Sequence, residues 1–175
     1  KETNDGNVAL HKLKDSPQTE TEAFKNWFKD SKVVDDKGRP QTVYHGTDAN
    51  IKVFSSEKTA DGLFWFTDSK QEILDGEVGA AASGNIIDAY LSIQNPADWD
   101  QYDAKTIDQL ISDGHDGVIL DEGEGSKTYI VFDPEQIKSA TKNKGTFNPE
   151  DPNILNNITD QQVFEAEYQN GMTVD

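Results

Sequence analysis

The sequence predicts a single α+β domain in which short β-strands outnumber a few helices. Its 175 residues are a natural size for one compact domain with loose ends. Hydrophobic residues make up 34% of the chain and the mean hydropathy is −0.77, which allows one core but not two. Short apolar runs separated by Gly, Pro, Asn and Asp are typical of strands joined by turns.

A helix with one apolar, mostly aromatic face is predicted near the start of the domain, over Thr19–Lys32. Thr19 or Thr21 would cap it, and acidic residues fall in its first turn, where the helix dipole favours them. The preceding residues, 1–18, are polar and irregular, so we expect a flexible N-terminal segment. The apolar face would consist of Ala23, Phe24, Trp27 and Phe28.

Short strands are expected next, with a turn over residues 36–40 after the first of them. A helix over Asp68–Asp75, capped by Asp68 or Ser69, would follow the last of these strands. Residues 79–84 are small and would form a loop, and Asn85–Ile93 alternates as a longer strand does, until Asn95-Pro96 stops it. The short strands are Val33–Val34, Thr42–His45, Lys52–Phe54 and Leu63–Thr67.

The second half of the domain is predicted to hold one helix and further short strands. The helix covers Ala104–Ser112 and is closed by Gly114. An acidic, Gly-rich loop over residues 121–127 separates two strands, and Gln136–Ala140 is a last short element. The helix would turn Ile107, Leu110 and Ile111 inward, and the two strands are Gly117–Leu120 and Tyr129–Phe132.

The C-terminal part changes composition after Lys142, where Asn, Pro and Asp dominate. We expect this stretch to wrap the surface as an extended arm. The domain would therefore run over residues 19–155, and residues 156–175 would form a C-terminal tail or linker.

The charge and the missing residue types restrict the partners. The net charge of −17 would repel the phosphates of nucleic acids and anionic membrane surfaces, so neither is expected as a partner. A small dinucleotide needs only a local pocket and stays possible. The chain has no cysteine and its three histidines are far apart, so no metal site is expected. No apolar run approaches the roughly 20 residues of a membrane span.

The first candidate site is the strand end Tyr44-His45-Gly46-Thr47. A lone histidine beside a strand is more often structural than catalytic. Its neighbours favour function here, because Gly46 lets a ligand approach the backbone and Thr47 adds a hydroxyl. The segment therefore offers a ring nitrogen, backbone groups and a hydroxyl to a planar amide and a ribose.

A second candidate lies on the aromatic strand that precedes Asp68. Phe64 and Phe66 fall on one face, and the simplest interpretation is that both are buried. Trp65 points to the other face, where it can stack on a flat ring. A third segment, Thr128–Ile137, is by itself an ordinary strand and turn.

Taken in order, these segments resemble the ADP-ribosyltransferase superfamily, and most closely the ADP-ribosyltransferase domains of phage and polymorphic-toxin (polyvalent) proteins. The resemblance covers about Ala23 to Leu155 and implies a split β-sandwich of short strands with a few flanking helices. It rests on Asp30–Asp35 before the Tyr-His-Gly-Thr strand, on Gly62–Asp68, on Thr128–Asp133, on Phe132–Ala140 and on Asn148–Leu155.

The resemblance implies NAD as co-substrate and assigns roles to the first two segments. His45 would hydrogen-bond the NAD ribose and the Gly46 backbone would hold the nicotinamide amide, with Tyr44 and Thr47 beside them. Trp65 stands where the family has a tyrosine that stacks on nicotinamide. The family's second tyrosine is missing, because Gly76-Glu77 occupies its place.

The resemblance assigns the catalytic carboxylate less directly than it assigns the NAD-binding residues. The reaction passes through an oxocarbenium-like state that a carboxylate stabilises. In the polymerase pattern this glutamate would fall at Thr128. Phage relatives carry a glutamate in the preceding loop, which implies Glu124 first and Glu122 second, although an acidic Gly-rich loop is by default solvated.

The leading hypothesis is a mono-ADP-ribosyltransferase that modifies a host protein as a phage-borne or toxin-like effector, located in the virion and then in the bacterial cytoplasm if phage-borne. An NAD glycohydrolase is a second hypothesis, and a degenerate binding or structural module of a virion protein is a third. His115 and Arg39 are interpreted as turn residues.

Overall fold

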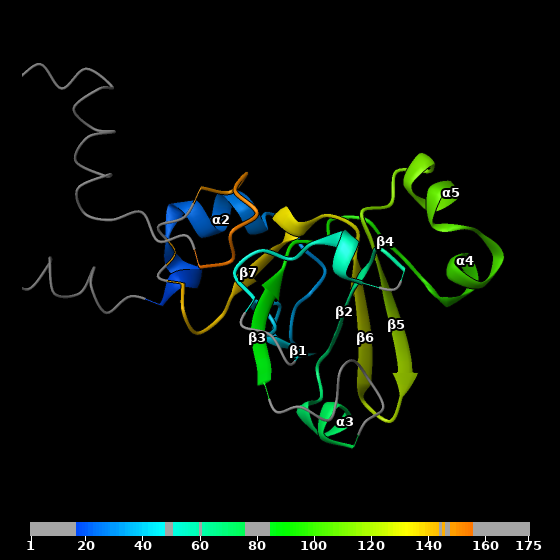
Figure 1. The fold of residues 1–175 in the computed structure, drawn as a ribbon, viewed down its shortest axis with the longest axis horizontal. Helices are drawn as coiled ribbons and strands as arrows, with labels where there is room; N and C mark the ends of the chain where they lie inside the picture. The colour runs from blue at the N-terminus through cyan, green and yellow to red at the C-terminus, as the bar shows by residue number, and fades with distance from the viewer. Residues whose placement is uncertain are drawn as a thin grey trace, which may run out of the picture.

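The computed structural model describes residues 17–47, 51–59, 61–75, 85–143, 145 and 148–155. These residues form a seven-stranded mixed sheet with a few short helices around it (Figure 1), so the predicted α+β class is confirmed. The predicted N-terminal segment, small-residue loop and C-terminal tail fall, apart from a few residues, outside the described ranges.

The strands follow one another across the sheet in the order β4-β5-β6-β2-β1-β3-β7. All neighbours are antiparallel except β4 and β5, which are parallel. The strands are β1 Val43–Thr47, β2 Phe64–Thr67, β3 Asn85–Leu91, β4 Pro96–Ala97, β5 Gly117–Gly123, β6 Ser126–Val131 and β7 Ile137–Ser139.

The helices gather at three places around the sheet. In Figure 1, α2 lies beside β7 and β3, α4 and α5 lie beyond β4 and β5, and α3 lies at the end where β5 turns into β6. They are η1 Gln18–Glu20, α2 Glu22–Phe28, η2 Ser56–Lys58, α3 Lys70–Leu74, α4 Trp99–Ala104, α5 Ile107–Ser112 and η3 Pro134–Gln136.

The apolar side chains form one main core and two smaller clusters. Because side chains alternate along a strand, the register places the main core on one face of the sheet. On the other face, one cluster packs under α5 and the other consists of the aromatic side chains of α2. The main core includes Val43, Phe54, Phe64, Phe66, Ala89, Leu91, Tyr129, Val131, Ile137 and Ile154.

The sheet is nearly divided between β1 and β2. The two strands share a single registered pair, Tyr44 opposite Thr67, whereas β1 and β3 pair over five residues from Val43 to Thr47. Beyond that pair no further registered pair joins the two strands, which agrees with the split β-sandwich that the resemblance implied.

The C-terminal arm is fastened to the sheet through the main core. Ile154 is 1% exposed, its N–H donates to the Lys52 carbonyl at 2.8 Å, and its carbonyl accepts from the Ser139 N–H at 3.1 Å. The Lys138 ammonium, buried under the arm, donates to the backbone carbonyls of Asn148 and Asp151. The arm was predicted to lie on the surface, but it contributes to the core.

Two helices differ from their predicted bounds. The first is shorter than Thr19–Lys32, since α2 begins after its cap Thr21 and ends at Lys29, whose φ is 48°. The prediction of one helix over Ala104–Ser112 was wrong: α4 and α5 are separate because Asp98 and Thr106 each start a helix with a capping box. Leu110 is buried as expected, but Ile111 is 50% exposed.

The strand predictions also need correction at several places. Val33–Val34 and Lys52–Phe54 form only isolated bridges, Val34 to Pro40 and Val53 to Asn153. The predicted loop over residues 121–127 is wrong, because β5 and β6 extend to a tight turn at Glu124 and Gly125. β3 ends at Leu91, before the predicted end at Ile93, and Pro96 starts the edge strand β4, where a missing N–H is tolerated.

Candidate functional site

His45 directly follows Tyr44, the residue of β1 that is in register with β2, so it lies where the β1–β2 pairing ends, a place called here the β1–β2 opening. Its Nδ1 is 2.7 Å from the carbonyl oxygen of Trp65, and its ring packs against Phe54 and Phe66 with centroid distances of 5.1 and 5.3 Å. The imidazole thus replaces a backbone donor of β1 where the two strands diverge. The histidine has a structural contact and remains part of the strand end that the sequence singled out.

The contact to Trp65 also fixes the protonation of His45. A carbonyl oxygen only accepts, so Nδ1 carries the proton. Burial lowers the pKa of His45, and the bond to the Trp65 carbonyl opposes this shift only in part, so the ring is neutral at pH 7. Nε2 then presents a lone pair, and it makes no hydrogen bond within the described residues.

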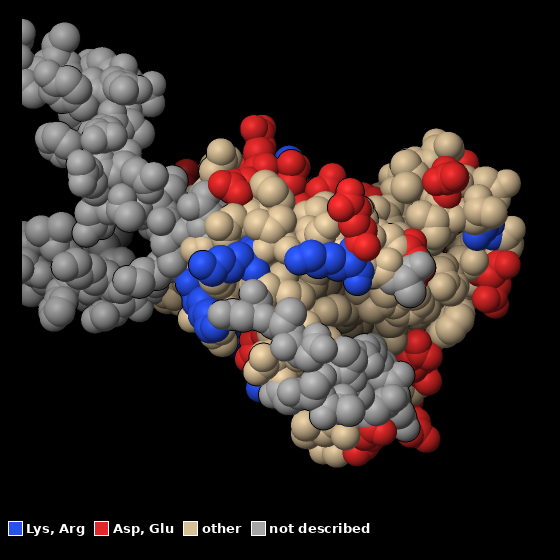
Figure 2. Space-filling model, viewed as in Figure 1, with Lys and Arg blue, Asp and Glu red and all other residues tan. Residues whose placement is uncertain are grey.

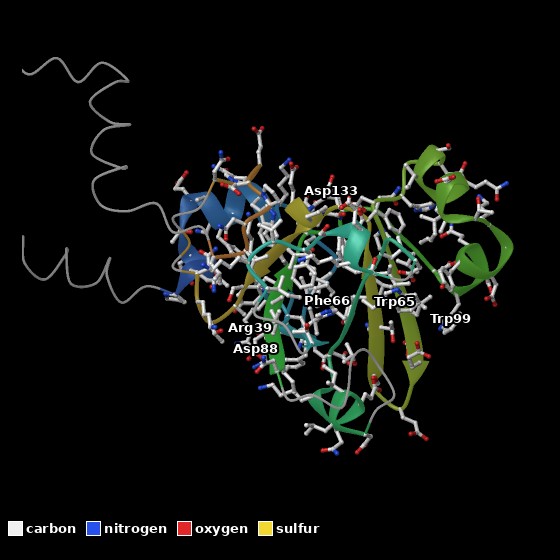
Figure 3. The ribbon with its side chains drawn as sticks, in the orientation of Figure 1. Arg39, Trp65, Phe66, Asp88, Trp99 and Asp133 are labelled. Atoms are coloured by element: carbon white, nitrogen blue, oxygen red, sulfur yellow. The ribbon has the colours of Figure 1, made fainter. Side chains whose placement is uncertain are left out.

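The Trp65 indole lies on the opposite face of the sheet from the His45 ring. Tyr44 pairs with Thr67, so Tyr44, Trp65 and Thr67 share one face, while His45 and Phe66 share the other. The indole Nε1 donates to Asp61 at 2.8 Å. The structure therefore joins His45 and Trp65 through the backbone, and Figure 3 shows Phe66 near the centre of the sheet with Trp65 nearer β6.

The other residues of the β1 motif are set in the sheet. Thr47 and Gly46 are buried and pair with Asn85 and Ile86 of β3. Tyr44 is half-buried, and the Lys70 ammonium of α3 lies 4.8 Å from the centre of its ring.

A pocket of about 350 Å³ opens beside this motif. Ile87 and Asn85, the cross-strand neighbours of His45 and Thr47, line it on the β3 side. Ser139 and Ile154 line it from β7 and the arm. The pocket thus combines apolar walls with hydroxyl and amide groups next to the strand end.

A carboxylate that sequence reasoning missed lies at the other end of the β1–β2 opening. Glu72 of α3 accepts a hydrogen bond from the Thr67 hydroxyl at 2.7 Å and another from the Ser126 hydroxyl. Thr67 is directly opposite Thr128 in the sheet. The only sequence signal is a glutamate in the helix that follows the aromatic strand, and helix faces alone do not place it.

Glu122 and Glu124, the glutamates that the sequence favoured, lie on the β5–β6 hairpin. Both are exposed, and neither carboxylate makes a hydrogen bond or an ion pair within the part of the chain described. Glu124 has φ 54°, in the left-handed region between two glycines of the turn. The structure brings this hairpin to α3 through Ser126 and Glu72.

Asp68 adds a second acid near Glu72. Its Oδ1 accepts from the Lys127 N–H at 3.0 Å, which ties the start of α3 to β6. Burial raises the pKa of Asp68, and the charge of Glu72 raises it further. This end of the sheet is therefore strongly acidic, and Figure 2 shows red side chains near α3 and along the upper and right edges.

The remaining candidates have ordinary roles. Arg39 is exposed and pairs with Asp35 at 2.9 Å, and the ring of His115 contacts the Asn95 carbonyl at 3.1 Å. In the described ranges, no group of three His, Cys, Asp or Glu side chains could hold a metal ion. None of the helices described there has the length and apolar character that a bilayer span requires.

Comparison with protein families identifies the fold that carries this site. The model of the family described as ADP-Ribosyltransferase in polyvalent proteins matches residues 35–110 and 98–147. The chain belongs to this family. No curated protein and no solved structure matched the chain. The family assigns ADP-ribosyltransferase activity in general terms and implies NAD as the co-substrate.

The groups around His45 are of kinds that can bind parts of NAD. The neutral His45 ring offers an acceptor to a sugar hydroxyl, and the adjoining pocket offers room for part of a dinucleotide. Nicotinamide is a flat ring with one amide, which an aromatic side chain and backbone groups can bind.

Proposed function

We propose that the chain transfers one ADP-ribose unit from NAD to a side chain of an acceptor protein. The observation that carries the proposal is His45, a neutral imidazole held by the Trp65 carbonyl at the mouth of the β1–β2 opening. Its Nε2 accepts a hydrogen bond from a ribose hydroxyl, and the Gly46 backbone next to it holds the nicotinamide amide.

Trp65, Tyr44 and Thr47 complete the proposed NAD site. In the proposed site the indole of Trp65 stacks on nicotinamide from the face of the sheet opposite the His45 imidazole, where the β1–β2 pairing ends. Tyr44 is on the same face as Trp65 and borders the same end of the opening.

Transfer of a single unit is favoured over chain elongation. The position at which the polymerase pattern has a glutamate is Thr128, a buried neutral residue. The proposed role is that of a phage-borne or toxin-like effector that modifies a host protein.

Incubation with NAD labelled in its adenylate half tests the proposal. Label on a protein supports transfer, free labelled ADP-ribose alone supports an NAD glycohydrolase, and unchanged NAD contradicts both. Calorimetry with NAD then identifies a binding module that has kept the fold without turnover.

A further inference from the structure

We propose that Glu72 of α3 is the catalytic carboxylate of this transferase, in place of a glutamate on strand β6. The inference rests on the proposed function. It assigns to a helix residue the carboxylate that the polymerase pattern has on the strand. The sequence alone did not predict this role for Glu72.

The contacts of Glu72 place its carboxylate over the sheet beside Thr128. Thr67 pairs directly with Thr128, and Ser126 is two residues away from it on the same face of β6. Glu72 bonds both the Thr67 and the Ser126 hydroxyl, so its carboxylate lies between β2 and β6 at the row of Thr128. A glutamate side chain at residue 128 would project into this same region.

The hydroxyl partners orient the carboxylate. The Thr67 oxygen accepts the Ser69 N–H at 3.1 Å, so its own proton is directed to Glu72. The Ser126 hydroxyl donates to the other carboxylate oxygen. The two hydrogen bonds hold the carboxylate of the half-buried Glu72 in one position.

Glu72 lies next to the β1 motif through the sheet. Thr67 is opposite Tyr44, the residue that precedes His45, so the carboxylate lies on the face of the sheet that holds Tyr44 and Trp65, while the His45 imidazole lies on the other face. Lys70, two residues before Glu72 at the start of α3, reaches Tyr44 and Asp88, which are paired and share one face of the sheet. Glu122 and Glu124 have no contact of this kind with the residues that the structure describes, and both lie on the exposed hairpin.

The chemistry that Glu72 performs is charge stabilisation and proton transfer. The bond between the ribose C1′ and the nicotinamide nitrogen breaks, and its electron pair goes to nicotinamide, which leaves neutral. The Glu72 carboxylate stabilises the positive charge that develops on the ribose. The acceptor forms the new bond to C1′, and its proton passes to Glu72 and then to solvent.

The variant Glu72→Gln tests this assignment with little disturbance of the fold. Its amide oxygen accepts from one hydroxyl and its NH₂ group donates to the other, so both partners stay satisfied while the charge is lost. We expect kcat to fall about 100-fold or more with the NAD Kd nearly unchanged. Glu122→Gln and Glu124→Gln, the matched controls, should keep wild-type kcat.

Moving the carboxylate from residue 72 to residue 128 distinguishes a catalytic role of Glu72 from a structural one. The double variant Glu72→Gln with Thr128→Glu returns the carboxylate to the strand and should recover at least 10-fold of the lost activity, which a structural role of Glu72 would not explain. Wild-type activity in Glu72→Gln, or its loss in Glu124→Gln alone, overturns the assignment while the proposed function stands. An inactive wild-type chain overturns both.

Discussion

The hydrogen bond between His45 and the Trp65 carbonyl leads to a prediction that separates folding from NAD binding. The δ-nitrogen of an asparagine side chain can take the place of Nδ1, but asparagine has no atom at the position of Nε2. His45→Asn should therefore keep the bond to Trp65 and lose the bond to the ribose. His45→Ala should lose both.

The structure sets the size of each effect. Loss of one hydrogen bond to the ribose costs about 0.5–1.5 kcal/mol, which corresponds to a roughly 2- to 13-fold higher Kd for NAD. In His45→Ala the Trp65 carbonyl is left without its partner, which costs about 1–3 kcal/mol of folding free energy. Loss of the ring packing against Phe54 and Phe66 adds to that cost.

Isothermal calorimetry with NAD and urea unfolding measure the two effects. We expect His45→Asn to be more stable than His45→Ala, because it keeps the bond to Trp65, and to bind NAD more weakly than wild type, while His45→Ala is impaired in both. Wild-type affinity in His45→Asn would refute the role of Nε2. Wild-type stability in His45→Ala would refute the structural role of Nδ1.

Three further predictions concern the fold that holds the site. Lys29→Gly should raise the stability by up to about 1 kcal/mol, because Lys29 has a φ of 48° that glycine adopts without strain. Ile154→Ala should lower the stability by about 2–5 kcal/mol, because it empties a fully buried position of the main core. Burial lowers the pKa of Lys138 to about 8, so between pH 8 and 9.5 the unfolded chain holds this proton and the folded chain does not. Lys138 therefore makes stability rise with pH in that window, by up to about 2 kcal/mol, and Lys138→Met should remove that rise.

Urea unfolding of matched variants checks these three expectations. Lys25→Gly, on the exposed face of the same helix, should lower stability by about 1 kcal/mol. If Lys25→Gly and Lys29→Gly changed the stability in the same direction, the prediction for Lys29 would be contradicted. Leu74→Ala, at a 65% exposed position, should change little, and an equally small effect of Ile154→Ala would contradict the second. Parallel pH profiles of wild type and Lys138→Met would contradict the third.

The local patterns of the sequence were sufficient for the strands that carry the β1 motif and the aromatic alternation. Phe64 and Phe66 are buried in the main core, and Trp65 faces the other side, as period-two alternation predicts. The separation of α4 from α5 could also have been predicted, since Asp98 to Gln101 and Thr106 to Gln109 both have capping-box spacing.

The register between strands and the contacts between distant segments could not be predicted from local sequence patterns. His45 and Trp65 lie on opposite faces of the sheet because of the β1–β2 register, which the single pair of Tyr44 with Thr67 sets. The position of Glu72 depends on contacts with Ser126, which is 54 residues away in sequence. Helix periodicity places a side chain on a face, but it does not identify the strand that this face meets.

Release of free nicotinamide from NAD by the intact chain tests the central claim most directly, because every transfer or hydrolysis at this site must release it. With NAD labelled in the nicotinamide ring, the wild-type chain should release label in the presence of an acceptor protein, and Glu72→Gln should do so about 100-fold more slowly. A folded wild-type chain that releases no nicotinamide would contradict the account.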